Sequence, residues 1–244
     1  MPESFEDEIK SLQRNHRVTE HPFVKRSLEG EASEEAIKVQ VYQFYFHTVG
    51  FVKGLARLVS NCRVPELRKE IATGLYEEET GKLTGTAPHL ELFFQYAEGW
   101  GINRDQLSTK AYMLPETSSL INWYMYASML EPFIGIAVFN VAAEGVNITF
   151  PGAPGLSRLT ADAMTQKYGR SKKEVEFWDL HDRADQEHSG TGVRILGAHA
   201  KSEEDRARVK TAIQMTKDAW WKFYDGFEAW RLEDCTRHNS AAFY

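Results

Sequence analysis

Apolar residues recur along nearly the whole chain at the three- to four-residue spacing of an amphipathic α-helix, whereas the alternating pattern of a β-strand is almost absent. Ser33 and Pro65 are typical of helix starts, and Leu67, Ile71 and Leu75 form the inward stripe of the helix that Pro65 opens. Helices are expected near residues 33–61, 65–80, 88–101, 117–146, 156–168, 171–198 and 203–231. We therefore predict one all-α domain over residues 1–244, a bundle of about seven to eight helices that builds ligand sites from side chains on facing helices.

The composition restricts the possible function classes. With 42% hydrophobic and 26% charged residues, a chain of 244 residues can bury a sizeable core. Its net charge of −6 argues against a nucleic-acid partner, which requires a basic face. The acidic first residues contain no apolar signal segment, and no uncharged run is long enough to span a membrane. Two cysteines, Cys62 and Cys235, form no disulfide framework, so a cytoplasmic location is expected.

The segment FWDLHDRADQEH, residues 177–188, carries the most specific pattern. His181, Asp185 and His188 are spaced i, i+4 and i+7, and at about 100° per residue they project from one stripe of a helix. Two imidazoles and a carboxylate that converge in a protein interior are a natural set of metal ligands. The alternative is a surface helix that carries these residues by chance.

Glu144 is the only charged residue in the 17-residue stretch IGIAVFNVAAEGVNITF. A buried carboxylate costs several kcal/mol unless a partner, a proton or a metal ion neutralises it. Glu144 is therefore a second candidate ligand, with solvent contact or an arginine partner as the alternative. Glu131, which opens the apolar part of the same predicted helix, is expected to face water.

Glu79 and His89 form the third signal. Glu79 belongs to the acidic run Glu77–Glu79, and it continues the Ile71–Leu75 stripe at i+4, so we predict that Glu79 points inward among the three. Gly81, Gly85 and Pro88 break the helix before His89, which lets the two side chains converge from successive helices. An interior or capping histidine is the alternative for His89.

Together these residues supply three carboxylates and three histidines from four helical segments. The candidate ligands are Glu79, His89, Glu144, His181, Asp185 and His188. Six ligands exceed what one metal ion takes from protein when it keeps a position open for chemistry, so they suit two divalent ions. Imidazole and carboxylate without thiolate favour iron or manganese.

At this point the chain resembles the heme-oxygenase-like diiron oxidases and oxygenases, a branch of the superfamily that includes pyrroloquinoline quinone synthase C and the TenA thiaminases. The resemblance covers most of the chain, through HPFVKRSLEGEASEEAIKVQVYQFYF, LRKEIATGLYEEETG, FFQYAEGWGINRDQL and FWDLHDRADQEH. It implies the same six ligands, because the family pairs a glutamate and a histidine, adds a central glutamate and ends with His-x3-Asp-x2-His. Gly74 is a departure, since relatives often have asparagine at this position.

The resemblance implies two Fe(II)/Fe(III) ions that react with O2, as co-substrate, to form a peroxo-type oxidant, with an external electron donor. We predict N-oxygenation of a small amine or other nitrogen-containing metabolite, as in a biosynthetic pathway. C–C cleavage of an amino acid and oxidative decarboxylation of a fatty acid are the alternatives. A metal-free thiaminase-like enzyme or binding protein is a further one, although such enzymes use a cysteine nucleophile and neither cysteine here has an evident base.

Substrate contacts are expected on the helix near residues 41–58. His47 belongs to a polar stripe there, and Lys53 lies close to it and could hold a substrate carboxylate. The alternative for Lys53 is that its long side chain reaches solvent. A small molecule is the expected substrate and a homodimer the expected assembly, with no nucleic-acid or membrane partner.

Overall fold

A computed structural model describes residues 4–151 and 153–236, apart from the side chains of residues 183–188. Along these residues the chain forms ten α-helices and five short 3₁₀- or π-helical segments, and its one extended pairing is a bridge between Phe150 and Ala153. The all-α prediction is confirmed, although seven to eight helices is too low a number. In chain order the elements are α1 (Phe5–Arg14), η1 (Arg17–Glu20), α2 (Pro22–Glu29), α3 (Glu34–Asn61), α4 (Pro65–Thr80), α5 (His89–Gly99), η2 (Gln106–Lys110), α6 (Pro115–Ala127), α7 (Pro132–Ile136), η3 (Ala137–Ala143), η4 (Glu144–Asn147), α8 (Leu156–Gln166), α9 (Glu176–His199), α10 (Glu203–Ala229) and η5 (Leu232–Thr236).

The helix expected over residues 117–146 is divided into four elements. Pro132 has no N–H to donate to the carbonyl four residues earlier, and Glu131 before it is extended, with ψ 141°, so the chain turns between α6 and α7. After α7 the backbone widens into the π-helical η3 and then tightens into the 3₁₀-helical η4. Such departures from α geometry re-aim the side chains that follow them. Here they precede and contain Glu144.

Most predicted helix starts are confirmed. The Ser33 hydroxyl accepts a hydrogen bond from the Ala36 N–H and caps α3, and Pro65 is the first residue of α4. Pro88 precedes α5 instead of lying in its first turn. The start expected at Ser171 is wrong for α9, because Ser171 and Glu174 bond to each other's backbone in a separate turn and the helix begins at Glu176.

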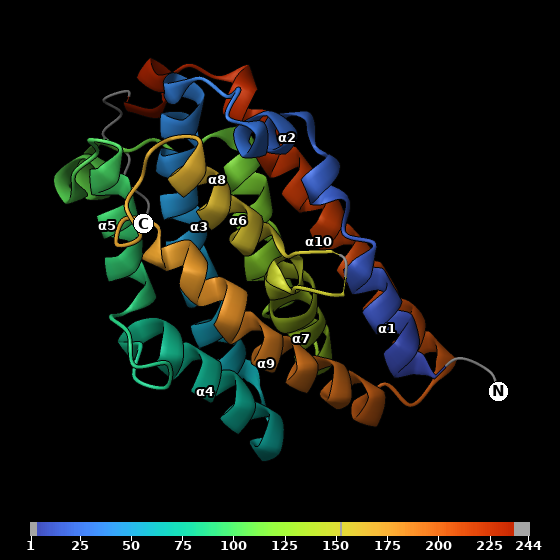
Figure 1. Ribbon diagram of the computed structural model, residues 1–244. Helices are drawn as coiled ribbons and strands as arrows, with labels where there is room; N and C mark the ends of the chain where they lie inside the picture. Colours follow the sequence, from blue (N-terminus) through green and yellow to red (C-terminus); the bar gives the residue numbers. More distant parts are fainter. Residues whose placement is uncertain (1–3, 152, 237–244) are drawn as a thin grey trace.

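The long helix α9 crosses the front of the bundle in Figure 1, with α4 and α5 on one side of it and α1 on the other, while α3, α6 and α7 lie behind. Aromatic rings join the layers: the Phe44 ring of α3 lies 5.2 Å from both Trp178 of α9 and Phe223 of α10. Helix α3 approaches η3 closely at the centre because residue 54 is a glycine: a Cβ at Gly54 would lie 2.5 Å from the Phe139 ring of η3. The core therefore brings α3, η3 and α9 to one place.

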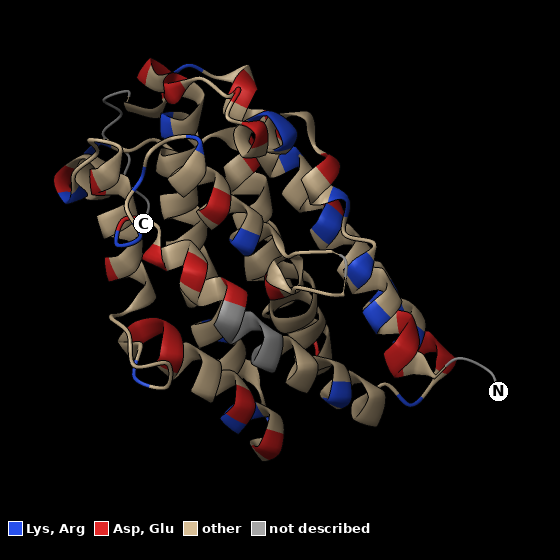
Figure 2. Cartoon of the chain, viewed as in Figure 1, with Lys and Arg blue, Asp and Glu red and all other residues tan. Residues whose placement is uncertain are grey.

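The surface carries both signs of charge. Acidic and basic residues are interspersed over the helices that face the viewer in Figure 2. Among the described helices, none combines the length and the apolar character that a membrane span requires.

Candidate metal centre

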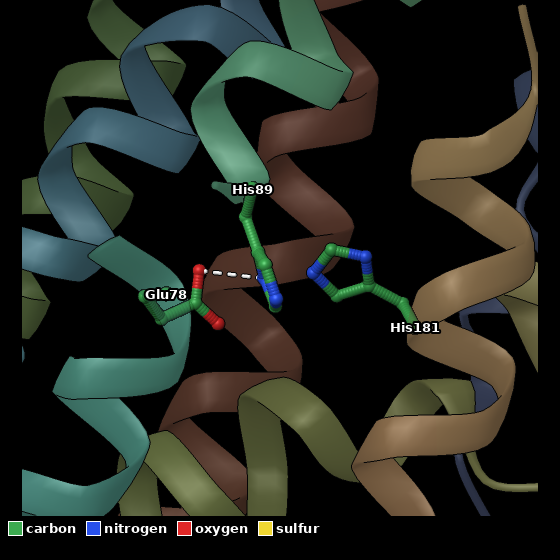
Figure 3. A group of neighbouring side chains, drawn as sticks. All are labelled: Glu78, His89 and His181. Atoms are coloured by element: carbon green, nitrogen blue, oxygen red, sulfur yellow. Dashed lines mark ion pairs between the residues drawn. The ribbon is translucent and has the colours of Figure 1, made fainter. Parts of the chain in front are cut away.

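Three side chains from three different helices converge in the interior. Glu78 near the end of α4, His89 at the start of α5 and His181 in α9 each offer a ligand atom, and these atoms lie within 4.8 Å of one another. Figure 3 shows that the three side chains point toward one another. His89 Nδ1 lies 2.9 Å from Glu78 Oε2, and the His89 and His181 rings meet edge to face at 4.9 Å. His89 is 1% exposed and Glu78 8%, so both are shielded from bulk water, and His181 is half-buried.

The prediction that Glu79 faces the interior is wrong, and Glu78 occupies that position. Glu79 is exposed on α4. Each step of four residues advances a side chain by about 40° around a helix, so the Leu67, Ile71, Leu75 series has turned away from the core by Glu79. Seven residues instead return within about 20°, which keeps Glu78 on the buried face that Ile71 occupies.

His181 is held in the form that binds a metal ion. Its Nδ1 lies 2.7 Å from the Phe177 carbonyl oxygen, which can only accept, so Nδ1 carries the proton and Nε2 keeps its lone pair. Burial lowers the pKa of His181 to about 4. The ring is therefore neutral near pH 7, as metal coordination requires.

Glu77 fixes the loop that leads to His89. Its side chain is wholly buried and accepts hydrogen bonds from the Leu83 N–H, at 2.7 Å, and from the Thr84 hydroxyl. The other ring nitrogen of His89, Nε2, lies 3.5 Å from Glu77 Oε1. Although burial acts in the opposite direction, the hydrogen bonds from Thr84 and Leu83 and the nearby His89 together lower the pKa of this carboxyl. One end of the His89 ring thus faces Glu78 and the other faces Glu77.

Glu144 begins η4 and is 6% exposed, so its predicted burial is confirmed. Its carboxylate accepts a hydrogen bond of 3.4 Å from the Asn140 side chain, one turn earlier. Glu131 is exposed, as predicted, and it forms an ion pair with Arg208.

A cavity of about 50 Å³ adjoins the cluster and is lined in part by Glu78, Glu144 and His181. Five aromatic side chains form much of its remaining wall: Phe44, Phe51, Phe177, Trp178 and Trp220. His47 also lines it, and its Nε2 lies 3.2 Å from the Tyr124 hydroxyl. Burial lowers the pKa of His47 to about 3, so this ring is neutral as well.

The remaining expected site residues have different outcomes. Lys53 is exposed on α3 and is absent from the described lining of the cavity, so it is not placed to hold a substrate carboxylate there. Asp185 and His188 belong to α9, but their side chains lie outside the described part of the structure. Their predicted role as ligands stays a prediction.

The cysteines do not support a metal-free enzyme with a thiol nucleophile. Cys62 and Cys235 are both buried, and neither is among the described residues that line the cavity. Burial raises the pKa of the Cys235 thiol to about 12, which removes the reactive thiolate near pH 7.

The donor set fits a transition-metal ion. Imidazole nitrogens with carboxylate oxygen are ligands typical of iron, manganese and zinc. Two buried carboxylates, Glu78 and Glu144, line a cavity whose described wall contains no lysine or arginine. Since the two histidines on this wall, His47 and His181, are neutral, a bound cation would offset the buried negative charge.

Sequence comparison defines the class of protein. The profile of a family described as "Iron-containing redox enzyme" matches residues 40–221, about three quarters of the chain. The chain therefore belongs to this family of iron-containing redox enzymes, and the resemblance identified from the sequence is confirmed.

Individual relatives are more distant. The chain is 26% identical over 234 residues to a 4-aminobenzoate synthase of Nitrosomonas europaea, covering 91% of this chain and 90% of that protein. It is 26% identical over 234 residues to a pyrroloquinoline-quinone synthase of Pseudomonas aeruginosa, covering 94% and 88% of the two chains.

Solved structures agree on the fold. A protein of Shewanella denitrificans with a heme oxygenase-like fold superimposes with a TM-score of 0.74, at 17% identity, over 92% of this chain and 90% of that one. A TenA homologue of Pseudomonas syringae gives a TM-score of 0.73, at 14% identity, over 91% and 90%. The chain has the heme-oxygenase-like fold.

Proposed function

We propose that this chain is a non-heme oxygenase that binds two iron ions and uses dioxygen to N-oxygenate a small amine. The observation that carries the proposal is the convergence of Glu78, His89 and His181 beside Glu144. It is supported by the chain's membership of a family of iron-containing redox enzymes. In this proposal, Glu78, His89 and His181 hold iron, and Glu144, Asp185 and His188 complete the set for a second ion.

Bound iron would supply the redox chemistry that activates dioxygen. The balance of the proposed reaction is one oxygen atom to the amine nitrogen, giving a hydroxylamine, and the other to water. An external donor contributes the two electrons that this requires, together with two protons. The residues of the chain position the reactants: aromatic side chains exclude water from the cavity, and the His47 ring presents a neutral polar group to the substrate.

The charge of the cavity supports an amine over an amino acid as substrate. Apart from the bound iron itself, a substrate carboxylate in this buried site would need a cationic side chain, and the described lining residues include none. For this reason we place N-oxygenation of an amine before C–C cleavage of an amino acid.

Two adjacent glutamates provide a matched test of the metal site. Glu78→Gln removes a ligand charge inside the cluster, while Glu79→Gln makes the same change on the exposed side of α4. After anaerobic loading with Fe(II) and removal of excess metal, the parent and Glu79→Gln should hold two iron ions per chain, and Glu78→Gln should hold fewer. Equal iron contents in the two variants, or less than one ion per chain in the parent, would contradict the assignment.

The reaction itself is tested with the iron-loaded protein, oxygen, a chemical reductant and a panel of amines, amino acids and fatty acids. Mass spectrometry should detect one added oxygen atom on an amine, derived from ¹⁸O₂. Label incorporated only into products of the other two classes would overturn N-oxygenation while leaving the iron site standing.

A further inference from the structure

A second, larger cavity lies beside the candidate metal centre. Its volume is about 390 Å³, and its walls come from α4, the loop after α4, α7, η3 and the C-terminal half of α9. The polar side chains on its described wall are Glu70, Thr73, Glu77, Thr84, Asn140 and Thr191. Glu78, His89, Glu144 and His181 do not line it, so this cavity is distinct from the one at the cluster.

Two wall residues connect this cavity to the metal centre. Glu77 lines it and lies 3.5 Å from His89 Nε2, and Asn140 lines it and donates a hydrogen bond to Glu144. A molecule in the second cavity would therefore contact residues that themselves touch two candidate ligands. The cavity at the cluster has a volume of only about 50 Å³, room for a few water-sized groups, so the second cavity can hold a larger molecule than the first.

Gly74 keeps the second cavity open. It lies within α4, on the cavity wall, and a Cβ built there would have no described atom within 4 Å. Glycine inside a helix costs about 1 kcal/mol relative to alanine. Neither a close contact nor a left-handed backbone at this position requires a glycine. The missing side chain has one evident effect, which is to leave space next to Glu70 and Glu77.

The wall chemistry suits a small cation with a short aliphatic part. Two carboxylates, an amide and three hydroxyls offer hydrogen-bond acceptors, and the described wall contains no lysine or arginine. Glu70 is exposed and forms no ion pair with any residue that the structure describes. Isoleucine side chains at positions 71, 136 and 195 provide an apolar surface.

We infer that the second cavity binds a small aliphatic primary amine as its ammonium ion, with the ammonium group near Glu70 and the methylene groups against the isoleucines. The ammonium position near Glu70 lies on α4 about two turns from Glu78, so this site is separate from the place where the proposed reaction oxygenates a nitrogen atom. The inference goes beyond the proposed function, because it depends on residues outside the candidate ligand set.

Binding is tested with n-butylamine, which is protonated at neutral pH, and with n-butanol as a neutral molecule of similar size. Calorimetry on the full chain, with and without iron, should show butylammonium binding at least about tenfold more tightly than butanol, since hydrogen bonds to a charged group are the stronger ones. Glu70→Gln should remove much of this preference. Equal affinity for the two probes would overturn the cationic site.

Two substitutions at one position locate the site. Gly74→Leu should fill the cavity and reduce butylammonium affinity about tenfold or more, while Gly74→Ala, which adds one methyl group, should stay close to the parent. Unchanged affinity in Gly74→Leu would refute the location. If Gly74→Leu does not fold, the location is tested on the parent protein through nuclear Overhauser contacts between butylammonium and the labelled Ile71 methyl groups. The absence of these contacts would also refute the location.

The metal-free protein separates this inference from the proposed function. Butylammonium binding without iron, together with a chain that takes up no iron, would retain the amine site and discard the oxygenase. Normal iron uptake without amine binding would discard the amine site and leave the proposed oxygenase standing.

Discussion

Gly54 places the backbone of α3 directly against the Phe139 ring of η3, the segment that leads to Glu144. In Gly54→Ala the new Cβ would lie 2.5 Å from Phe139 Cζ and 2.7 Å from Cε1. Phe139 has no exposed surface, and it packs edge to face on Phe51 at 5.3 Å and against Tyr124 at 5.2 Å. The ring is therefore held by neighbouring rings, and either Phe139 or the contact between α3 and η3 must shift to admit the new Cβ.

The expected magnitude follows from two opposing effects. Overpacking a closed core costs about 1–3 kcal/mol. Replacing glycine by alanine inside a helix contributes about 1 kcal/mol in the other direction. Gly74→Ala in α4 receives the same helical gain without a clash, because its Cβ would meet open space. The difference between the two variants therefore isolates the steric cost, about 1–3 kcal/mol.

Urea denaturation of the parent and both variants measures this difference. With an m-value of about 2–3 kcal/mol/M, the midpoint of Gly54→Ala should lie about 0.3–1.5 M below that of Gly74→Ala. The midpoint of Gly74→Ala should equal or exceed that of the parent. Midpoints that coincide in the two variants would show that Phe139 yields without cost, and the close packing of α3 on η3 would not be a constraint on the site.

Two further predictions concern buried polar groups. Burial, with a smaller effect of Lys217, holds the pKa of His16 at about 3 against 6.5 in the unfolded chain, so the unfolded chain alone takes up a proton between these values. The contribution of His16 to the free energy of unfolding should therefore decrease by about 1.4 kcal/mol per unit as the pH falls through this window. His16→Gln should remove this contribution in urea titrations at about pH 7.5 and 5, and parallel slopes would contradict it. Glu77→Ala should lower Fe(II) affinity about 10–100-fold by releasing His89 and the loop before it, whereas Glu79→Ala should not. Anaerobic titration against a chelator measures both, and equal affinities would contradict the positioning role of Glu77.

Local sequence signals predicted the elements that carry the site. The Ser33 cap and Pro65 at the start of α4 depend on neighbouring residues only, so they were readable without a structure. The burial of Glu144 followed from the absence of other charges around it. Over residues 117–146 the apolar pattern continues across Pro132, so it predicted one long helix. The break that Pro132 causes between α6 and α7 was therefore missed.

The choice between Glu78 and Glu79 shows the limit of periodicity. A stripe extended in steps of four drifts around the helix, and the sequence does not say on which side the neighbouring helices lie. The i+7 relation of Glu78 to Ile71 was available as a signal, but the acidic run hid it. Glu77 contacts the loop after α4, and nothing in the sequence distinguished it from the rest of the acidic run.

By itself, the sequence determined an all-α chain, the histidines at positions 89 and 181 and the class of metal chemistry that such residues support, because these depend on composition and local spacing. Only the tertiary structure decided that Glu78 meets the two histidines, that Lys53 is exposed and absent from the described lining of the cavity at the cluster, and that Gly74 opens a second cavity next to Glu77. The physical reason is that each of these outcomes depends on how one helix is rotated and positioned against its neighbours. That rotation is set by packing across the whole core, including contacts as close as Gly54 with Phe139.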